Sequence, residues 1–413
     1  MRSARDLASL AEEGSLFAAT AMEKLERLQA ELQPLSERYD VVVANPPYMG
    51  SSSLGKWMGA WAKKHYLEAY RDLCTSFIDR GFTLSNDQGY SAMVTMQSWM
   101  FLGSYEKLRD MILHSHSISS MAHLGTRAFG AIGGEVVSTT ATVFANAKYE
   151  ARGSYFRLVD MGSEEEKQAG LLEALANPDC GWFYRCESYQ FQHAPGCPLA
   201  YWMNKSFFDS FGAGVSIDDL SNFTGSQNIT GDNNKYLRFR WEVNIATVGP
   251  QGGWVPYAKG GDYRRWYGNI DLVVDWSESG KLFYKKNSTS NLLSNEYWFK
   301  EGITYNAITS GKPHFRYMPN GCIFDKGGPS IIELGDRLPI VLAYLNSTTC
   351  EHYLDAMNPT LNLQVKDIKS LPLLIDEMNV DEITSIALEC IALSRTDWNQ
   401  QETSEGFVRH PLI

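Results

Sequence analysis

The sequence predicts an α/β fold with a partial Rossmann-like sheet, followed by a β-rich α+β domain and C-terminal helices. Apolar runs of strand length alternate with segments of helical periodicity between residues 39 and 161. Such alternation indicates a mainly parallel sheet that helices cover on both faces. Beyond about residue 220 the helical periodicity stops, and Gly, Asn, Ser and aromatic residues surround short predicted strands. Helical periodicity returns at 337–357.

Hydrophobic spacing predicts the elements in chain order. Leucines at helical spacing over residues 4–33, interrupted by Gly14, indicate two helical pieces that end near Pro34. We expect strands at 40–44, 89–100, 117–125, 136–146 and 153–161, and helices at 60–84, 104–113, 337–357 and 379–395. The expected segments are a helical N-terminal part (1–38), a sheet domain (39–220), a β-rich domain (221–335) and a helical C-terminal part (336–413).

Charge, aromatic content, cysteine spacing and the length of apolar runs indicate which class of protein this is. The net charge of −11 argues against a polyanionic partner, but residues 226–326 hold 13 Lys and Arg against 9 Asp and Glu, and 18 aromatic residues. A basic and aromatic middle in an acidic chain is typical of a nucleic-acid contact. The seven cysteines lack the paired spacing of a zinc site, so we expect no metal. No apolar run reaches the roughly 20 residues of a membrane span, so we expect a cytoplasmic protein.

The stretch YDVVVANPPYMG, residues 39–50, contains the candidate catalytic residues. A buried strand ends at Asn45, where ligands of open α/β sheets bind. Pro46 and Pro47 restrict the backbone and remove two N–H donors, so that carbonyl groups face outward. The Asn45 side-chain oxygen and the Pro46 carbonyl can both accept hydrogen bonds from one planar NH₂ group, while Tyr48 offers a ring for stacking. A rigid turn without function is the alternative interpretation.

The segment from 40 to about 160 resembles the S-adenosylmethionine-dependent amino-methyltransferases, with DVVVANPPYMGS matching their fourth motif in its adenine-associated form. The chain looks like the C-terminal part of the PglX-type adenine-specific DNA methyltransferases of BREX phage defence, relatives of restriction-modification enzymes. The resemblance implies that Asn45, Pro46, Pro47 and Tyr48 hold the amine and base of a flipped adenine in double-stranded DNA. It also implies that Asp72 and Phe77 lie near the cofactor, and that other defence proteins are partners.

A Gly-rich cofactor loop precedes the fourth motif in that family. Here only 39 residues come before it, and the glycine cluster at 128–137 leads into a predicted strand instead of a helix, which favours a turn. We therefore expect a fragment with an incomplete S-adenosylmethionine pocket, which does not methylate alone.

The basic and aromatic middle resembles the target-recognition domain of the same family. Its densest part is WVPYAKGGDYRRWYGN, residues 254–269, where guanidinium groups adjoin rings that can stack on bases. The alternative is a β-rich core whose basic residues are solvated. The expected DNA contacts are Lys259, Arg264, Arg265, Trp266, Tyr267, Lys312 and Arg316.

Two other functions fit the same residues. An Asn-Pro-Pro-Tyr strand end also suits methylation of RNA or of a protein amide, and a remnant domain can serve as a DNA-binding or complex-forming module without catalysis. The basic and aromatic second domain favours a DNA substrate.

Overall fold

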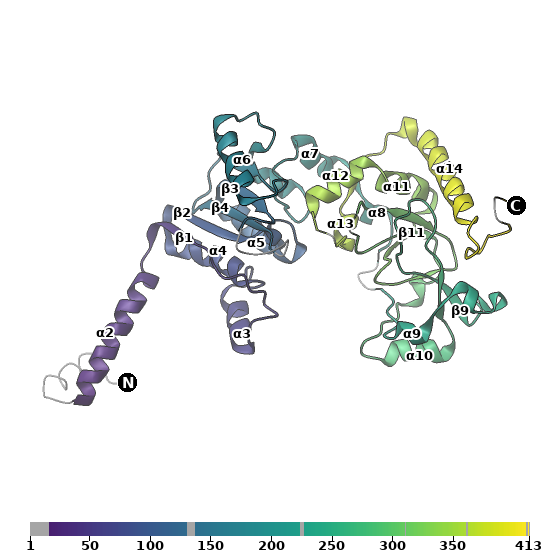
Figure 1. Ribbon diagram of the computed structural model, residues 1–413, viewed down its shortest axis with the longest axis horizontal. Coiled ribbons are helices and arrows are strands. Elements are labelled where there is room, and N and C mark those ends of the chain that lie inside the picture. Colours follow the sequence, from purple (N-terminus) through teal and green to yellow (C-terminus); the bar gives the residue numbers. More distant parts are fainter. Residues whose placement is uncertain are drawn as a thin grey trace. The chain divides into compact units, whose positions relative to one another are not determined.

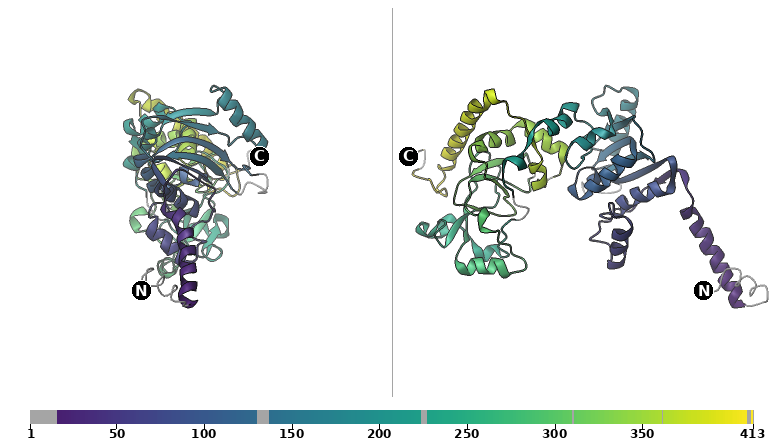
Figure 2. Two further views of the ribbon diagram at one scale, coloured as in Figure 1. Left: turned by 90° about the vertical axis from the view of Figure 1, so that its left-hand side faces the viewer. Right: turned by 180° about the vertical axis from the view of Figure 1, so that it is seen from behind.

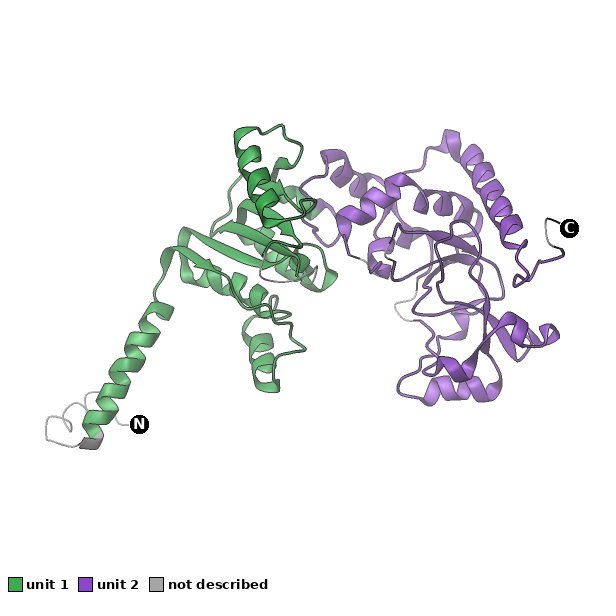
Figure 3. Ribbon diagram, in the orientation of Figure 1, with its two compact units in different colours: residues 1–192 green, residues 193–413 purple. Residues whose placement is uncertain are grey.

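The computed structural model describes residues 16–129, 137–223, 227–309, 311–360, 362–409 and 412. The chain forms two compact units, Met1–Gln192 and His193–Ile413, and each unit contains both strands and helices (Figure 3). The expected boundary near residue 220 is therefore too late. Residues 215 and 216 form a strand with residues 372 and 373, and this pairing places the stretch before residue 220 in the second unit.

The first unit contains a six-stranded sheet with helices (Figure 1). Its helices are α2 (Leu16–Ser36), α3 (Lys56–His65), α4 (Leu73–Leu84), α5 (Glu106–Ser115) and α6 (Glu164–Ala176), with 3₁₀ turns η1 (Gln97–Met100), η2 (Gly103–Tyr105) and η3 (Ser188–His193). Its strands are β1 (Tyr39–Ala44), β2 (Ser85–Met96), β3 (Ser117–Gly125), β4 (Thr139–Ala145), β5 (Arg152–Arg157) and β6 (Phe183–Glu187).

The sheet has the order β1-β2-β4-β3-β5-β6 and is mixed. Strands β1 and β2 are parallel, as are β3 and β5, whereas β4 runs antiparallel to both of its neighbours. The expectation of a mainly parallel sheet is wrong, because β3 and β4 are consecutive in the chain and adjacent in the sheet, as in a hairpin, which reverses β4.

Helix α4 packs closely on one face of β2. Gly81 makes this approach possible, since a Cβ atom there would lie 2.3 Å from Ser91 Oγ and 2.8 Å from Met93 Cε. Ala92 and Val94 alternate with these residues and therefore face the other side, where they line an apolar hollow together with α6. At β2 the sheet thus has α4 on one face and the apolar hollow on the other.

Strand β1 lies at the edge of this sheet, and its side chains are unusually exposed. The expectation of a buried strand before Asn45 is wrong, because β1 is an edge strand in which Val43 is 74% exposed and Val41 56% exposed. Among the described residues, no strand pairs with the outer edge of β1. Helix α2 leads into β1 and extends away from the sheet (Figure 2), with Pro34 inside its last turn instead of after its end.

The second unit combines short strands with helices. Its helices are α7 (Lys205–Ala213), α8 (Ile217–Leu220), α9 (Asn233–Tyr236), α10 (Glu278–Lys286), α11 (Leu338–Leu345), α12 (Thr348–Met357), α13 (Val365–Lys369) and α14 (Val380–Trp398). Its strands are β7 (Val215–Ser216), β8 (Leu237–Phe239), β9 (Trp254–Ala258), β10 (Leu272–Asp275), β11 (Gly302–Tyr305), β12 (Phe315–Met318), β13 (Ile323–Phe324), β14 (Ser330–Ile332) and β15 (Pro372–Leu373). Its 3₁₀ turns are η4 (Arg240–Glu242), η5 (Ile245–Thr247), η6 (Asn295–Tyr297), η7 (Gly335–Arg337) and η8 (Glu377–Asn379).

Three small sheets organise the second unit, with strand orders β13-β9-β10-β8, β12-β11-β14 and β15-β7. The first sheet is built around an aromatic core that includes Tyr257, Trp276 and Tyr284. Helix α11 packs against both α14 and strand β12. The helices after residue 336 therefore belong to the same unit as the β-rich part, instead of forming a separate segment.

The composition predicts neither a membrane-spanning helix nor a metal site. In the part of the chain that the structure describes, no helix combines the length and the apolar character that crossing a bilayer needs. The same residues contain no group of three or more His, Cys, Asp or Glu side chains arranged to hold a metal ion. Most of the glycine cluster at 128–137 lies outside the described residues.

Candidate active site at the end of strand β1

Asn45 follows the last residue of β1, and its side chain is exposed. The Tyr48 hydroxyl donates a hydrogen bond to Asn45 Oδ1 across 3.3 Å, which places the ring beside the amide. Pro46 is buried and Pro47 is exposed. No described residue donates a hydrogen bond to the Pro46 carbonyl. The strand end therefore presents an amide oxygen, a carbonyl with capacity to accept, and an aromatic ring.

The buried carboxylate of Asp72 holds the loop that follows this motif. Asp72 Oδ1 accepts hydrogen bonds from the backbone N–H of Met49 at 3.2 Å and of Cys74 at 2.9 Å. The second bond caps the N-terminus of α4 and satisfies one of its first free N–H groups. One side chain thus joins the loop after Tyr48 to the start of a helix.

Tyr48 keeps its proton over the physiological range. Burial, and then the neighbouring Cys74, raise the pKa of the Tyr48 hydroxyl, and burial also raises the pKa of the Cys74 thiol. Tyr105 lies in the same environment, where burial and then the charges of Asp72 and Cys74 raise its pKa to about 12. The phenol of Tyr48 therefore acts as a neutral hydrogen-bond donor to Asn45. Local sequence patterns do not place Cys74 and Tyr105 near this site, because their proximity to it depends on packing between elements.

The two residues expected near the cofactor have different surroundings. Asp72 is 7% exposed, and one of its oxygens is occupied by two backbone N–H groups, so its position is that of a helix cap and loop anchor. Phe77 is 40% exposed on α4 and offers an aromatic face. Of the two described residues expected near S-adenosylmethionine, Phe77 thus presents an exposed contact surface and Asp72 does not.

In the second unit, carboxylates from distant parts of the chain pair with several of the expected DNA contacts. Glu351 of α12 accepts hydrogen bonds from Arg265 at 2.7 Å and from Lys312 at 2.9 Å. Lys259 pairs with the nearly buried Asp325 at 2.7 Å. These pairs fix the cations in place and reduce the positive potential that they present to a polyanion. Lys312 remains the most open of the three, with 68% of its side chain exposed.

Arg264, Trp266 and Tyr267 also make contacts within the unit. The Arg264 guanidinium donates to Asp397 and lies over the Trp398 ring at 5.0 Å. Trp266 is half-buried and has a left-handed backbone with φ of 72°. Tyr267 is only 4% exposed, so its expected stacking on a base is wrong, because the ring already packs in the core of the unit.

Arg316 is fully buried, and the expectation that it touches DNA is wrong for the same reason. Its Nη2 group donates to Asn306 Oδ1 at 2.9 Å, while Nε and Nη1 have no hydrogen-bond partner. Burial lowers the pKa of the guanidinium to about 10. The residue supports the fold around β12 and presents no surface to a ligand.

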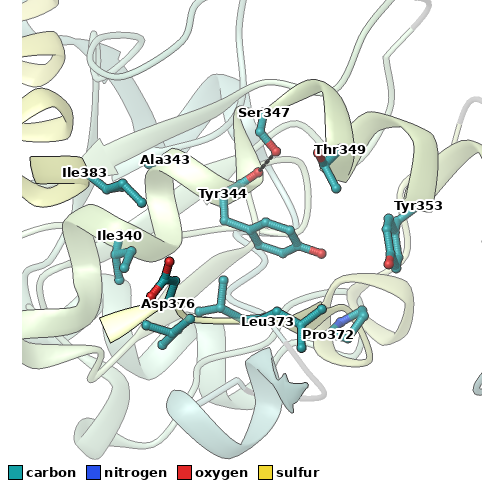
Figure 4. Close-up of a pocket in the computed structure, with 12 residues that line it drawn as sticks. Ile340, Ala343, Tyr344, Ser347, Thr349, Tyr353, Pro372, Leu373, Asp376 and Ile383 are labelled. Atoms are coloured by element: carbon teal, nitrogen blue, oxygen red, sulfur yellow. Dashed lines mark hydrogen bonds between the residues drawn. The ribbon is translucent and has the colours of Figure 1, made fainter. Parts of the chain in front are cut away.

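Two cavities of the second unit differ in chemistry. A cleft of about 800 Å³ is lined by Lys259, Lys326, several asparagines and glycines, and is polar. A cavity of about 360 Å³ lies among α11, α12 and β15 (Figure 4), where the Tyr344 ring projects over apolar side chains. The expected DNA contact Lys259 lines the polar cleft, whereas the apolar cavity contains none of the expected site residues.

Part of this chain matches the model of a known protein family. Residues 6–129 match the family model of the Eco57I restriction-modification methylase, and this match includes the strand end with Asn45 and Tyr48. Two solved structures share the fold. The first is the type IIL restriction-modification enzyme MmeI in complex with DNA. Its TM-score is 0.56 at 13% identity, and the match covers 88% of this chain and 50% of that one. The other is a nuclease-deletion mutant of the type ISP enzyme LlaGI with a DNA substrate mimic, with a TM-score of 0.51 at 11% identity, covering 91% and 43%.

Two curated relatives are similar along nearly the whole chain. The adenine-specific methyltransferase PglX of Lacticaseibacillus casei (strain Zhang) is 35% identical over 398 residues, which are 92% of this chain and 33% of the relative. The adenine-specific methyltransferase BrxX of Escherichia coli O9:H4 (strain HS) is 36% identical over 414 residues, covering 98% and 33%. The chain is therefore related to the PglX-type adenine-specific methyltransferases, of which it spans about one third.

Proposed function

We propose that this chain supplies the amine-holding strand end and the DNA-recognition unit of a site-specific DNA adenine-N6 methyltransferase. The observation that carries the proposal is the exposed Asn45 amide, bonded to Tyr48 at the carboxyl end of β1. The same arrangement lies within a chain that is 35–36% identical to adenine-specific methyltransferases.

The strand end would activate the target amine by hydrogen bonding. The adenine N6 lone pair is delocalised into the ring, and an NH₂ group that donates to both Asn45 Oδ1 and the Pro46 carbonyl keeps more of that lone pair on nitrogen. Because both acceptors are fixed by the strand and the two prolines, no reorganisation is needed as charge develops. S-adenosylmethionine would supply the electrophilic methyl group. Phe77 is the described residue that would contact this cofactor.

The base must leave the double helix to reach this site. Flipping costs a few kcal/mol of unstacking energy, which the Tyr48 ring partly offsets by stacking on the extruded base. The second unit would hold the duplex through Lys312, Arg265 and the polar cleft around Lys259. The DNA complexes of the two solved relatives support a DNA partner for this fold. A role in bacterial phage defence with further defence proteins completes the proposal.

A chimaera tests this function directly. This chain would replace the matching third of the E. coli BrxX relative, and transfer of labelled methyl groups to adenine in duplex DNA would be measured. We expect methylation, and we expect Asn45→Ala to lower its rate by roughly 10²–10³-fold, as for other lost groups that bind a developing charge. Asn86→Ala, a change of another asparagine outside the motif, serves as the control. Full activity of the Asn45→Ala chimaera would refute the assignment.

A further inference from the structure

Helix α3 belongs to an excursion that begins and ends beside the amine-holding loop. The Ser51 N–H donates to the Arg71 carbonyl at 2.8 Å, and Gly50 and Asp72 form an antiparallel bridge. These bonds join the two ends of residues 51–71 immediately after Tyr48. The excursion carries α3, which stands away from the sheet (Figure 1), and is anchored to the same loop as the candidate active site.

Large aromatic side chains form an exposed ladder on α3. The rings of Trp57 and Trp61 are stacked with centroids 6.5 Å apart and planes at 18°, and Trp61 stacks on His65 at 4.8 Å. Spacing of four residues places the three rings on one side of the helix. Trp57 is nevertheless 72% exposed and Trp61 39% exposed. Tryptophan is rarely so exposed in a folded protein, so the ladder marks an interaction surface.

The excursion is also basic. Residues 51–71 contain Lys56, Lys63, Lys64 and Arg71 but a single acidic residue, Glu68, in a chain whose net charge is −11. The three lysines are exposed, and none forms an ion pair with another residue that the structure describes. Four of the expected DNA contacts in the second unit, Lys259, Arg264, Arg265 and Lys312, are in contrast paired with Asp325, Asp397 or Glu351. The charges on α3 are available to a polyanion.

We propose that the α3 excursion binds DNA at unpaired bases, with Trp57 stacking on a base and Lys63 and Lys64 holding phosphates. Exposed aromatic faces combined with cations suit single-stranded nucleic acid, because every base has a ring face and every nucleotide a charge. Inside a duplex, neighbouring base pairs cover these faces. A flipped adenine uncovers them, and α3 is tied to the loop that would hold that adenine. In this respect the inference rests on the proposed function.

Binding to three labelled DNAs tests the inference without any methylation. The DNAs are an intact duplex, the same duplex with one abasic position opposite a central adenine, and a single strand, each titrated with this chain by fluorescence anisotropy. We expect the unvaried chain to bind the abasic duplex about tenfold more tightly than the intact one, since stacking on an unpaired base adds a favourable contact that the intact duplex does not offer. Trp57→Ala/Trp61→Ala should lose this preference and keep binding to the intact duplex.

Matched variants separate stacking from charge. Trp57→Phe/Trp61→Phe retains ring faces and should keep the preference for the abasic duplex. Lys63→Gln/Lys64→Gln should weaken binding to the abasic duplex and the single strand, and lower the slope of log affinity against log salt by about one to two. Leu172→Ala and Lys107→Gln change exposed residues elsewhere in the first unit and should alter neither quantity.

Three outcomes would overturn the inference. If Trp57→Ala/Trp61→Ala keeps the preference for the abasic duplex, α3 does not contact the unpaired base, while the proposed function stands because duplex binding persists. If the unvaried chain binds none of the DNAs, the inference and the proposed recognition unit fail together. If the double variant binds every DNA unchanged but dissociates an oligomer in sedimentation, the ladder is a protein interface instead.

Discussion

The carboxylate of Asp72 accepts a hydrogen bond from the backbone N–H of Met49, 23 residues earlier in the chain and one residue after Tyr48. Because the same oxygen also caps α4, the position of the motif and the start of the helix depend on one side chain. Under the proposed function, this relationship makes Asp72 a positioning residue for the amine site, and it predicts an effect of Asp72 on stability.

Asp72→Ala should lower the free energy of unfolding by about 1–2 kcal/mol, the usual cost of losing an N-terminal cap. Asp72→Asn keeps an acceptor oxygen and should cost less. Urea denaturation of both variants gives the comparison. Asp87→Ala, which removes an aspartate that is 94% exposed, should change stability by no more than about 0.5 kcal/mol. A stability of Asp72→Ala equal to that of the unvaried chain would show that the two bonds have no energetic role.

Glu351→Gln should strengthen non-specific DNA binding. The change frees Arg265 and Lys312 from their shared carboxylate and removes one negative charge near them. Each cation that then meets a phosphate adds about 0.9 to the salt slope for duplex DNA, so the slope should steepen by one to two. Anisotropy at several salt concentrations measures this. Glu389→Gln, an exposed glutamate of α14, removes the same charge away from these cations, and an equal gain there would contradict the explanation.

Arg316→Met should leave DNA affinity unchanged. The guanidinium is fully buried and two of its nitrogens lack hydrogen-bond partners, so an apolar side chain of similar length removes an incompletely satisfied charge. Such replacements are often neutral or stabilising. Thermal unfolding and duplex binding should both be measured. A tenfold loss of affinity with unaltered stability would restore the direct DNA contact that the sequence suggests.

Low pH should destabilise the first unit, because the buried His123 imidazole is neutral in the folded chain and takes up a proton more readily in the unfolded chain. Burial, and then the charges of Arg157 and Lys167, lower the pKa of this imidazole to about 3. The unfolded chain, with a histidine pKa near 6.5, binds the proton more readily, so the contribution of neutral His123 is complete above about pH 6.5 and is lost as the pH falls toward 3. At pH 5 the loss is about 2 kcal/mol.

Denaturant unfolding at pH 7 and pH 5 checks this pH dependence. His123→Gln should be less stable at pH 7, because its new amide must replace the bond to Gln97, but its stability should change less between the two pH values. His114→Gln alters an exposed histidine and should follow the unvaried chain. An equally steep acid loss in His123→Gln would assign the effect to other groups.

Local patterns predicted much of the first unit. Residues 117–125 and 40–44 alternate or cluster apolar side chains over strand length, and both form strands within one residue of the expected bounds. The expected helix at 60–84 is instead two helices, α3 and α4, separated before Asp72. A stricter use of the cap signal at Asp72 would have found this break.

Long-range contacts explain what the sequence could not reveal. Arg265 and Glu351 are 86 residues apart, and Arg264 and Asp397 are 133 apart, yet each pair forms an ion pair in the folded unit. Local density of Arg, Trp and Tyr is the same whether such cations face solvent or a carboxylate. The strand-end motif depends instead on consecutive residues, from Asn45 to Tyr48, and on the strand before them. Local sequence is therefore informative about this motif.

The exposed valines of β1 have a practical consequence for anyone who handles this polypeptide. An outer strand that no described strand pairs with on one edge, and that contains neither lysine nor proline, is a template for association with an identical strand. Concentrated preparations should therefore scatter light increasingly with time, and a charged replacement such as Val43→Lys should keep them clear.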